Sequence, residues 1–215
     1  MADNTSRMIA LLGAMRKQMN GAVADAMRYY GGKYGLNYGV SLPTLRSIAT
    51  AEQRDHSLAQ YLYKQQVREL RLAALYVAEG EKITMEELPT WAEGVINSEV
   101  AEEMAFALLP RTTILSQIFA EWSQNDNEFL AYAALMAASR SDLAQTQECI
   151  MTCSGIAAAY PSSRIIAQGV VALLSAAASN PECLGVIRNT LDSMHSSSTT
   201  DYITEEMEWR LDALQ

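Results

Sequence analysis

Two neighbouring stretches, NYGVSLPTLRSIA at residues 37–49 and LAQYLYKQQVRELRLAALYVA at residues 58–78, carry the clearest pattern in this chain. Leucine and alanine recur in both at helical spacing, and Pro43 stands where a helix can begin. We predict helices near residues 42–51, 56–64 and 66–79. Because the predicted connections are only two to five residues long, consecutive helices must fold back antiparallel to each other.

The same pattern extends in both directions through all 215 residues, which contain 32 alanines and almost no alternating β-branched runs. Caps support several helix starts, such as the capping box at Thr84–Glu87 and Asn180 before Pro181. We predict further helices near residues 5–30 (one helix or two), 84–96, 98–109, 112–123, 127–139, 142–156, 162–178, 182–194 and 201–213. About six helical hairpins in series favour an all-α solenoid of antiparallel helix pairs, forming one domain over residues 1–215. Weak similarity between the pairs leaves a globular all-α domain as the alternative.

The charge is distributed unevenly along the chain, which has 16 basic and 25 acidic residues and a net charge of −9. Residues 1–80 hold ten bases and six acids, whereas residues 81–215 hold six bases and nineteen acids. Nucleic-acid-binding proteins usually present a basic face to the phosphates. Only the N-terminal third of this chain could offer one.

Other features of the composition restrict the class of protein. Three cysteines are too few for a disulfide framework, no apolar run reaches the length of a membrane span, and the N-terminus does not resemble a secretory signal. We therefore expect a soluble, cytoplasmic protein that does not bind a membrane. The isolated histidines and the Cys149–Cys153 pair lack further ligands, so we expect no metal and no cofactor.

The stretch from Tyr30 to Ala49 contains four glycines that interrupt any helix. Spacing favours an ordered loop whose glycines adopt positive φ. The alternative is a glycine- and tyrosine-rich surface beside Lys33 and Arg46 that meets phosphate or an aromatic ring. No phosphate-binding loop motif is present.

Charged residues on two predicted helices have both structural and functional interpretations. Glu69 is too close in sequence to Arg68 to face it, so Arg68 and Arg71 are expected on a solvated face. A phosphate contact or an inter-helix ion pair is the alternative. The acids Glu99, Glu102 and Glu103 are best explained as partners of a helix dipole, ahead of a catalytic carboxylate pair. Cys149, Cys153, Trp91, Trp122 and Trp209 are expected in the core.

The stretches quoted above resemble the DNA alkylation repair (AlkD-like) family of HEAT-repeat proteins. That family shows a pattern "(F/Y)GV-x-x-P-x-LR-x-IA" followed by "LA-x-x-LW-x-S-x-x-(H/R)E-x-R-x-x-A". The first pattern is matched here by Gly39, Val40, Pro43, Leu45, Arg46, Ile48 and Ala49. The second is matched by Leu58, Ala59, Leu62, Arg68, Glu69, Arg71 and Ala73, with Tyr63 at the aromatic position. Asn180–Glu182 also resembles an "NPE" turn of the family.

The resemblance implies a HEAT-like, armadillo-like stack of helices that cradles DNA. Active members remove N3- and N7-alkylated purines without a metal or cofactor. Aromatic rings and one carboxylate stabilise the cationic base and the developing sugar cation.

Matching the family's catalytic motifs to this chain leaves most of them unfilled. Within a register error of one, the "WD-x-(V/L)-D" loop falls at Glu99–Glu103, so a glutamate replaces the tryptophan and Glu103 (or Glu102) replaces the aspartate. Tyr132 falls at the position of the catalytic arginine. Val171 falls at the second tryptophan and Leu174 at the second arginine. Losing several such groups, at about 2 to 4 kcal/mol each, would remove most of the rate enhancement.

The sequence therefore predicts a divergent, non-catalytic or repurposed binding member of this family. The alternative is a weak alkylpurine DNA glycosylase with Glu103 as its carboxylate and Tyr38 or Tyr132 supplying a ring. The expected partner is DNA, through the basic N-terminal third, or else an unidentified protein. Five side chains are predicted to contact nucleic acid: Lys33, Tyr38, Arg46, Arg68 and Arg71.

Overall fold

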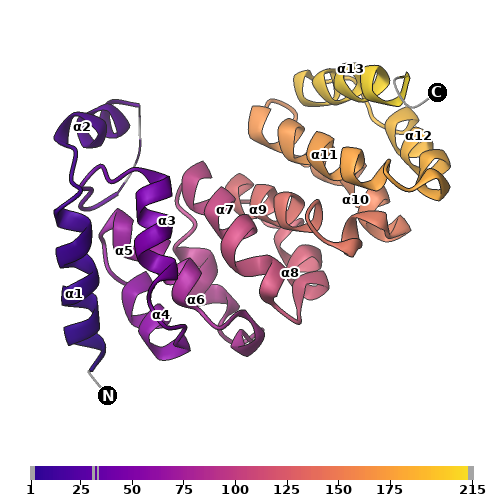
Figure 1. Ribbon diagram of the computed structural model, residues 1–215. Helices are drawn as coiled ribbons and strands as arrows, with labels where there is room; N and C mark the ends of the chain where they lie inside the picture. The colour runs from indigo at the N-terminus through magenta and orange to yellow at the C-terminus, as the bar shows by residue number, and fades with distance from the viewer. Residues whose placement is uncertain (1–2, 31, 33, 213–215) are drawn as a thin grey trace. The chain divides into compact units, whose positions relative to one another are not determined.

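The computed structural model describes residues 3–30, 32 and 34–212. Thirteen α-helices run through these residues in chain order, and the described part contains no β-strand, only one isolated bridge between Leu36 and Val67 (Figure 1). The prediction of an all-α chain built from antiparallel helix pairs is confirmed. Contacts between residues group the chain into two compact units, Met1–Thr113 and Ile114–Gln215. The expectation of a single domain over residues 1–215 stays a prediction.

The N-terminal unit contains α1 (Asn4–Arg16), α2 (Gly21–Tyr29), α3 (Leu42–Thr50), α4 (His56–Tyr63), α5 (Arg68–Val77), α6 (Leu88–Glu93) and α7 (Ser98–Glu103). Helices α3, α5 and α7 pack one after another, while α4 packs against α5 and α1. Helix α5 is the centre of this unit, since every residue from Arg68 to Val77 except Arg71 is buried.

The C-terminal unit contains α8 (Leu115–Trp122), α9 (Glu128–Ala138), α10 (Gln147–Ala159), α11 (Arg164–Ala177), α12 (Leu184–Asp192) and α13 (Ser198–Asp212). Helices α9, α11 and α13 pack in sequence as one layer, and α10 packs against α12 in a second layer. From α9 to α13, helices thus contact the second helix along the chain, which is the arrangement expected of stacked helical pairs.

Side-chain caps fix the starts of many helices. The side chains of Asp3, Asn20, Ser41, Asp55 and Asn97 each accept a hydrogen bond from a backbone N–H in the first turn of the following helix. Asn20 separates α1 from α2, so the segment predicted near residues 5–30 is two helices.

Two details of the predicted helices are wrong. The capping box at Thr84–Glu87 does not open a helix: Glu87 N donates to Thr84 O in a turn, and α6 begins at Leu88 with Pro89 in its first turn. Trp209 is not in the core, because 72% of it is exposed on α13. Trp91 and Trp122 are buried as predicted, as are Cys149 and Cys153. No helix within the described ranges is both long and apolar enough to cross a lipid bilayer.

Candidate functional site

A buried arginine organises the N-terminal unit. Arg68 opens α5 and has no exposed surface. Its Nε lies 2.8 Å from Glu99 Oε2 and its Nη2 lies 2.5 Å from Glu99 Oε1, while Nη1 donates to Val40 O at 2.9 Å and to Glu69 Oε1 at 3.1 Å. Fork-shaped pairing of this kind satisfies a guanidinium that has been removed from water.

Glu69 fastens the loop before α3. Its buried carboxylate accepts hydrogen bonds from Tyr38 N at 3.2 Å and Val40 N at 3.3 Å. Between these two residues, Gly39 has a φ of +69°, and a Cβ there would lie 2.1 Å from Asn20 O. The interpretation of this stretch as an ordered loop is therefore confirmed for residues 34–40. The expectation that its glycines adopt positive φ holds for Gly39 but is wrong for the other described glycines, Gly32 and Gly35.

Glu99 also reaches the loop through Tyr34. The Tyr34 hydroxyl lies 2.5 Å from Glu99 Oε2 and 3.2 Å from Asn97 Oδ1. Burial, followed by the negative charge of Glu99, raises the pKa of Tyr34 well above its usual value. The phenol thus stays protonated and donates to the carboxylate.

Glu103 is the carboxylate of a second cluster, one helical turn further along. Glu103 is 2% exposed, and both of its carboxylate oxygens accept hydrogen bonds. Arg46 Nε lies 3.1 Å from Oε2, Arg46 Nη2 donates to Oε1, and the Tyr76 hydroxyl donates to Oε2. The hydrogen bond to Glu103 raises the pKa of Arg46. Arg46 also lies over the ring of Phe106, 4.8 Å from its centroid, and Phe106 is 52% exposed.

The helix is irregular immediately after this carboxylate. Met104–Leu108 forms a π-helical turn, in which Leu109 N donates to Met104 O five residues earlier. Such turns are rare and occur frequently at functional sites. Arg46, Tyr76, Glu103, Phe106 and this turn together form the candidate site, which we call the Glu103 cluster.

Three sequence interpretations are corrected by this geometry. Glu69 does pair with Arg68 despite being adjacent in sequence, with 3.1 Å between Arg68 Nη1 and Glu69 Oε1. Arg68 lies in the core and not on a solvated face, and the alternative of an inter-helix ion pair is the correct one. Glu99 does lie in the first turn of α7, but its carboxylate and that of Glu103 serve as partners of arginines as well.

Sequence reasoning offered an ion pair of Arg68 only as the alternative, and it named neither Glu99 nor Glu103 as the partner of an arginine, although a signal was present. Glu99 and Glu103 are four residues apart and therefore share one face of a helix. Arg46 and Arg68 both belong to the quoted motifs. These two acids on one helix face could have been predicted to form ion pairs with the two arginines.

The residues predicted to contact nucleic acid lie in different environments. Arg68 is buried and bonded to Glu99, so its guanidinium is not available to a phosphate. Arg46 keeps 38% of its side chain exposed but is bonded to Glu103. Tyr38 is half-buried, with the Arg16 guanidinium 5.8 Å from its ring centroid. Arg71 is half-buried beside a pocket described below. Lys33 lies outside the described residues.

The two predicted catalytic residues belong to different units. Glu103 ends α7 in the N-terminal unit, whereas Tyr132 lies in α9 of the C-terminal unit. Tyr132 is 5% exposed and packs against α11, where a Cβ added to Gly169 would lie 3.1 Å from its ring. A catalytic role for either residue stays a prediction.

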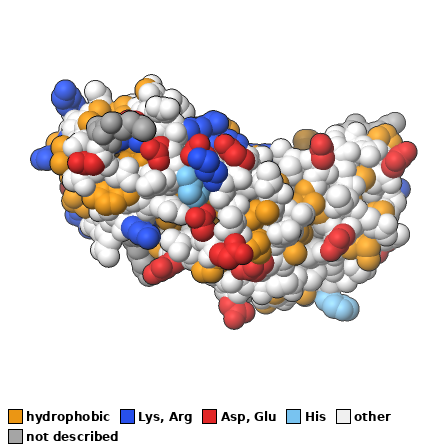
Figure 2. All heavy atoms as spheres, turned by 90° about the horizontal axis from the view of Figure 1, so that it is seen from below, with side chains coloured by type: hydrophobic (Ala, Val, Ile, Leu, Met, Phe, Trp, Pro, Cys, Tyr) orange, Lys and Arg blue, Asp and Glu red, His pale blue; other side chains and the backbone are white. Residues whose placement is uncertain are grey.

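The surface of the N-terminal unit carries most of the basic side chains visible in Figure 2, while acidic side chains are spread across the whole face. An aromatic pair also stands exposed at the end of α2. Tyr29 and Tyr30 are 83% and 84% exposed, with ring centroids 5.1 Å apart in an edge-to-face arrangement.

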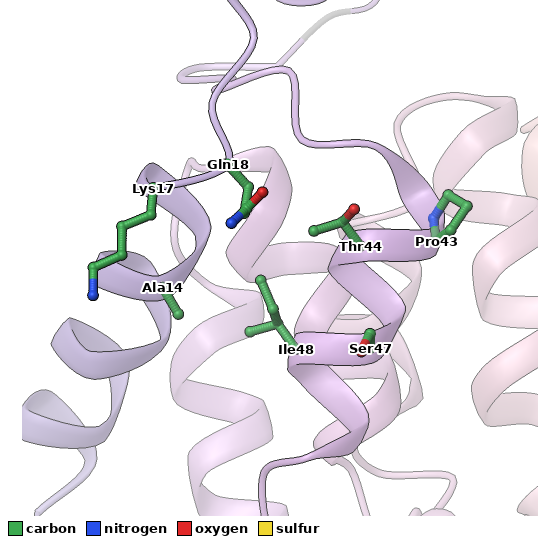
Figure 3. Close-up of a pocket in the computed structure, with 7 residues that line it drawn as sticks. All are labelled: Ala14, Lys17, Gln18, Pro43, Thr44, Ser47 and Ile48. Atoms are coloured by element: carbon green, nitrogen blue, oxygen red, sulfur yellow. The ribbon is translucent and has the colours of Figure 1, made fainter.

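An open recess of about 580 Å³ lies between the end of α1 and α3 (Figure 3). Gln18, Thr44 and Ile48 face the space between the two helices, whereas the Lys17 side chain extends along α1 and away from α3. This recess brings no charged group toward a ligand. In the described residues, no group of three His, Cys, Asp or Glu side chains is arranged to hold a metal ion.

Comparison with known proteins identifies the family. The family model described as DNA alkylation repair enzyme matches residues 11–158, which include the quoted motifs, Glu103 and Tyr132. None of the curated proteins matches the chain. One solved structure is similar to this chain, with a TM-score of 0.71 and 14% sequence identity over 97% of this chain and 95% of that chain. It is described as "a new family of proteins related to the HEAT-like repeat DNA glycosylases with affinity for branched DNA structures". This likeness confirms the HEAT-like helical repeat fold. Because the family model covers well over half of its residues, the chain belongs to the DNA alkylation repair enzyme family.

Proposed function

We propose that this chain is a DNA-binding member of its family that does not excise alkylated bases. The observation that carries the proposal is the state of Glu103, whose two oxygens are bonded by Arg46 and Tyr76. A glycosylase carboxylate must stabilise positive charge that develops in the transition state. Glu103 is already neutralised by a guanidinium, so it would have to give up that partner first.

The other positions carried over from the family's motifs support the same conclusion. Glu99, at the first tryptophan position, is bonded to Arg68, and Val171, at the second, is a buried aliphatic residue. Tyr132 and Leu174 carry no positive charge at the two arginine positions. A cationic base would therefore find no indole clamp at these positions.

Binding to DNA is supported by the N-terminal unit. Several of its described bases make no ion pair with another described residue: Arg16, Lys17, Arg54, Lys64 and Arg71. The exposed rings of Tyr29 and Tyr30 can stack on bases that have left a duplex. The solved structure with the same fold is described as having affinity for branched DNA. With a net charge of −9, the chain should bind only at low salt and with a steep salt dependence.

Excision is tested by incubating the protein with DNA methylated at purine N3 and N7 and measuring free 7-methylguanine and 3-methyladenine. We expect no release above the level without protein, and the same result for Glu103→Gln. Release by the wild type above the level without protein would overturn the proposal. Loss of that release in Glu103→Gln, or in Glu102→Gln, would identify the carboxylate of a weak glycosylase.

Binding is tested by fluorescence anisotropy with a duplex, a single strand and a four-way junction of equal length, over a series of salt concentrations. We expect the junction and the single strand to bind more tightly than the duplex. Replacing Tyr29 and Tyr30 by alanine should weaken both of these by roughly fivefold or more, since stacking contributes about 1–3 kcal/mol per base. No binding at low salt would refute the DNA-binding role and favour a protein partner.

A further inference from the structure

One guanidinium in the N-terminal unit is partly shielded from water and leaves a buried nitrogen without a hydrogen-bond partner among the described residues. Arg71 lies one turn after Arg68 on α5 and is half-buried. Its Nε has no contact with solvent and no hydrogen-bond partner among the described residues. The Arg71 guanidinium instead lies over the aromatic ring of Tyr63, whose centroid is 5.9 Å from the guanidinium carbon.

Other half-buried or buried arginines of this unit are fully paired, which makes Arg71 an exception. Arg7 bonds to Glu52 and Asp55, and Arg111 donates to the carbonyl oxygens of Leu75, Ala78 and Ala107. A charge that is partly desolvated and unpaired costs free energy. The fold therefore holds Arg71 in a state that an incoming anion would stabilise.

Arg71 lines a pocket of about 350 Å³ formed by residues at the ends of α4 and α6. The other lining residues are Tyr63, Lys64, Gln66, Thr90, Glu93 and Gly94. Lys64 adds a second exposed cation and Thr90 adds a hydroxyl donor, while Glu93 is the one carboxylate in this lining set. No ion pair between Arg71 and Glu93 is formed in the described structure, so the pocket carries a net positive charge.

The back wall of the pocket is rigid. The Tyr63 hydroxyl donates to Trp91 O at 2.7 Å, and Tyr63 is only 3% exposed. Any Cβ at Gly94 would lie 2.3 Å from the Tyr63 ring. Glycine at this position is therefore required for the end of α6 to approach the ring.

From this arrangement we propose that Arg71, Lys64 and Thr90 form a binding site for a phosphate group. A tetrahedral anion with several acceptor oxygens can accept from a guanidinium fork, an ammonium and a hydroxyl together. The pocket is larger than a lone ion needs, so the phosphate belongs to a larger molecule. It is either a phosphodiester of a nucleic acid or a phosphomonoester of a small molecule. This inference does not depend on the proposed DNA-binding function, because inorganic phosphate alone tests it.

The first experiment titrates the full-length chain with inorganic phosphate at constant ionic strength and follows backbone amide chemical shifts by NMR. We expect saturable shifts at residues 64–66 and 90–94, with Arg71→Met weakening the affinity roughly tenfold to a hundredfold. Arg188→Met is the matched control, because Arg188 undergoes the same chemical change but is an exposed arginine of the C-terminal unit at a different recess. Equal phosphate affinities for wild type and Arg71→Met would overturn the proposal.

Two further variants guard against a trivial loss of structure. Arg71→Lys keeps the charge but removes the fork and should bind phosphate with intermediate affinity. Glu93→Gln removes the competing carboxylate and should bind several-fold more tightly, which a disrupted pocket could not do. An unchanged or weaker affinity in Glu93→Gln would count against the site.

The source of the phosphate is distinguished by two probes in the same assay. Deoxyadenosine monophosphate offers a phosphomonoester, and a dinucleotide without terminal phosphates offers only a phosphodiester. Tighter binding of the dinucleotide would assign the pocket to a nucleic-acid backbone, and tighter binding of the monophosphate to a small molecule. Binding of neither probe, with saturable binding of inorganic phosphate, would refute the larger ligand.

Discussion

Replacing Arg68 by methionine tests whether one buried guanidinium holds the N-terminal unit together. Arg68 has no exposed surface and bonds to Glu99, Glu69 and Val40 O. Methionine can occupy much of the space but leaves Glu69, also fully buried, with only the backbone N–H groups of the loop as donors. Removing one partner of a buried ion pair costs about 3–5 kcal/mol. A chain of this size loses about 2–4 °C of Tm per kcal/mol, so we expect Tm to fall by about 6–20 °C.

The assay is urea and thermal unfolding followed by circular dichroism, with Arg71→Met as the matched control. Arg71 lies on the same helix and undergoes the same chemical change, but it has no ion pair within the described structure to lose. We expect Arg71→Met to change the free energy of unfolding by less than about 1 kcal/mol. Equal losses for the two variants, or a loss below about 1 kcal/mol for Arg68→Met, would show that the network is not what stabilises this unit.

Three further perturbations give separate tests. Gly39→Ala places a Cβ within 2.1 Å of a backbone oxygen at a φ of +69° and should destabilise the fold by about 1–3 kcal/mol. Gly13→Ala has open space around it and should stabilise the fold by up to about 1 kcal/mol, so the two variants should shift the thermal melt in opposite directions. The pKa of Asp55 lies below 3.8 because its carboxylate accepts from the Leu58 N–H and bonds to Arg7. A carboxylate whose pKa is lowered by folding stabilises the folded state above its unfolded pKa, and this stability is lost as the pH falls through the folded pKa. The difference in unfolding free energy between wild type and Asp55→Asn should therefore shrink between about pH 5 and pH 2. A difference that does not change with pH would contradict this. Burial raises the pKa of Cys149 to about 12, so iodoacetamide at about pH 8 should leave this thiol unmodified until the chain is denatured. Labelling is measured by mass spectrometry, and rapid labelling of the folded chain would contradict the prediction.

The helices could be predicted where local chemistry decides them. Asn20, Asp55 and Asn97 each cap the helix that follows, because a short polar side chain satisfies first-turn N–H groups that have no partner within the helix. The prediction that the capping box at Thr84–Glu87 opens a helix is wrong, because the helix begins after it, at Leu88. Pro89 is a better first-turn residue, and the segment before it turns with a shorter hydrogen-bond spacing.

The Glu103 cluster could be predicted only in part. The family resemblance pointed to Glu103, but its partner Arg46 is 57 residues away in sequence, and no local pattern joins positions that only packing brings together. The pairing of Arg68 with adjacent Glu69 escaped prediction because the rule for helix faces assumes side chains that project outward from a regular turn.

A π-helical turn holds one residue more than the α-helical turn that it replaces. The turn Met104–Leu108 therefore marks a place where this chain tolerates a difference of one residue in length. A relative that lacked one residue here could close the turn into ordinary helix and leave the packing on either side intact. The residues on either side would keep their positions around the helix axis, and only side chains within the turn, such as Phe106, would change place. A single codon gained or lost at this point would thus exchange the ring that covers Arg46 for another side chain, without rebuilding the fold.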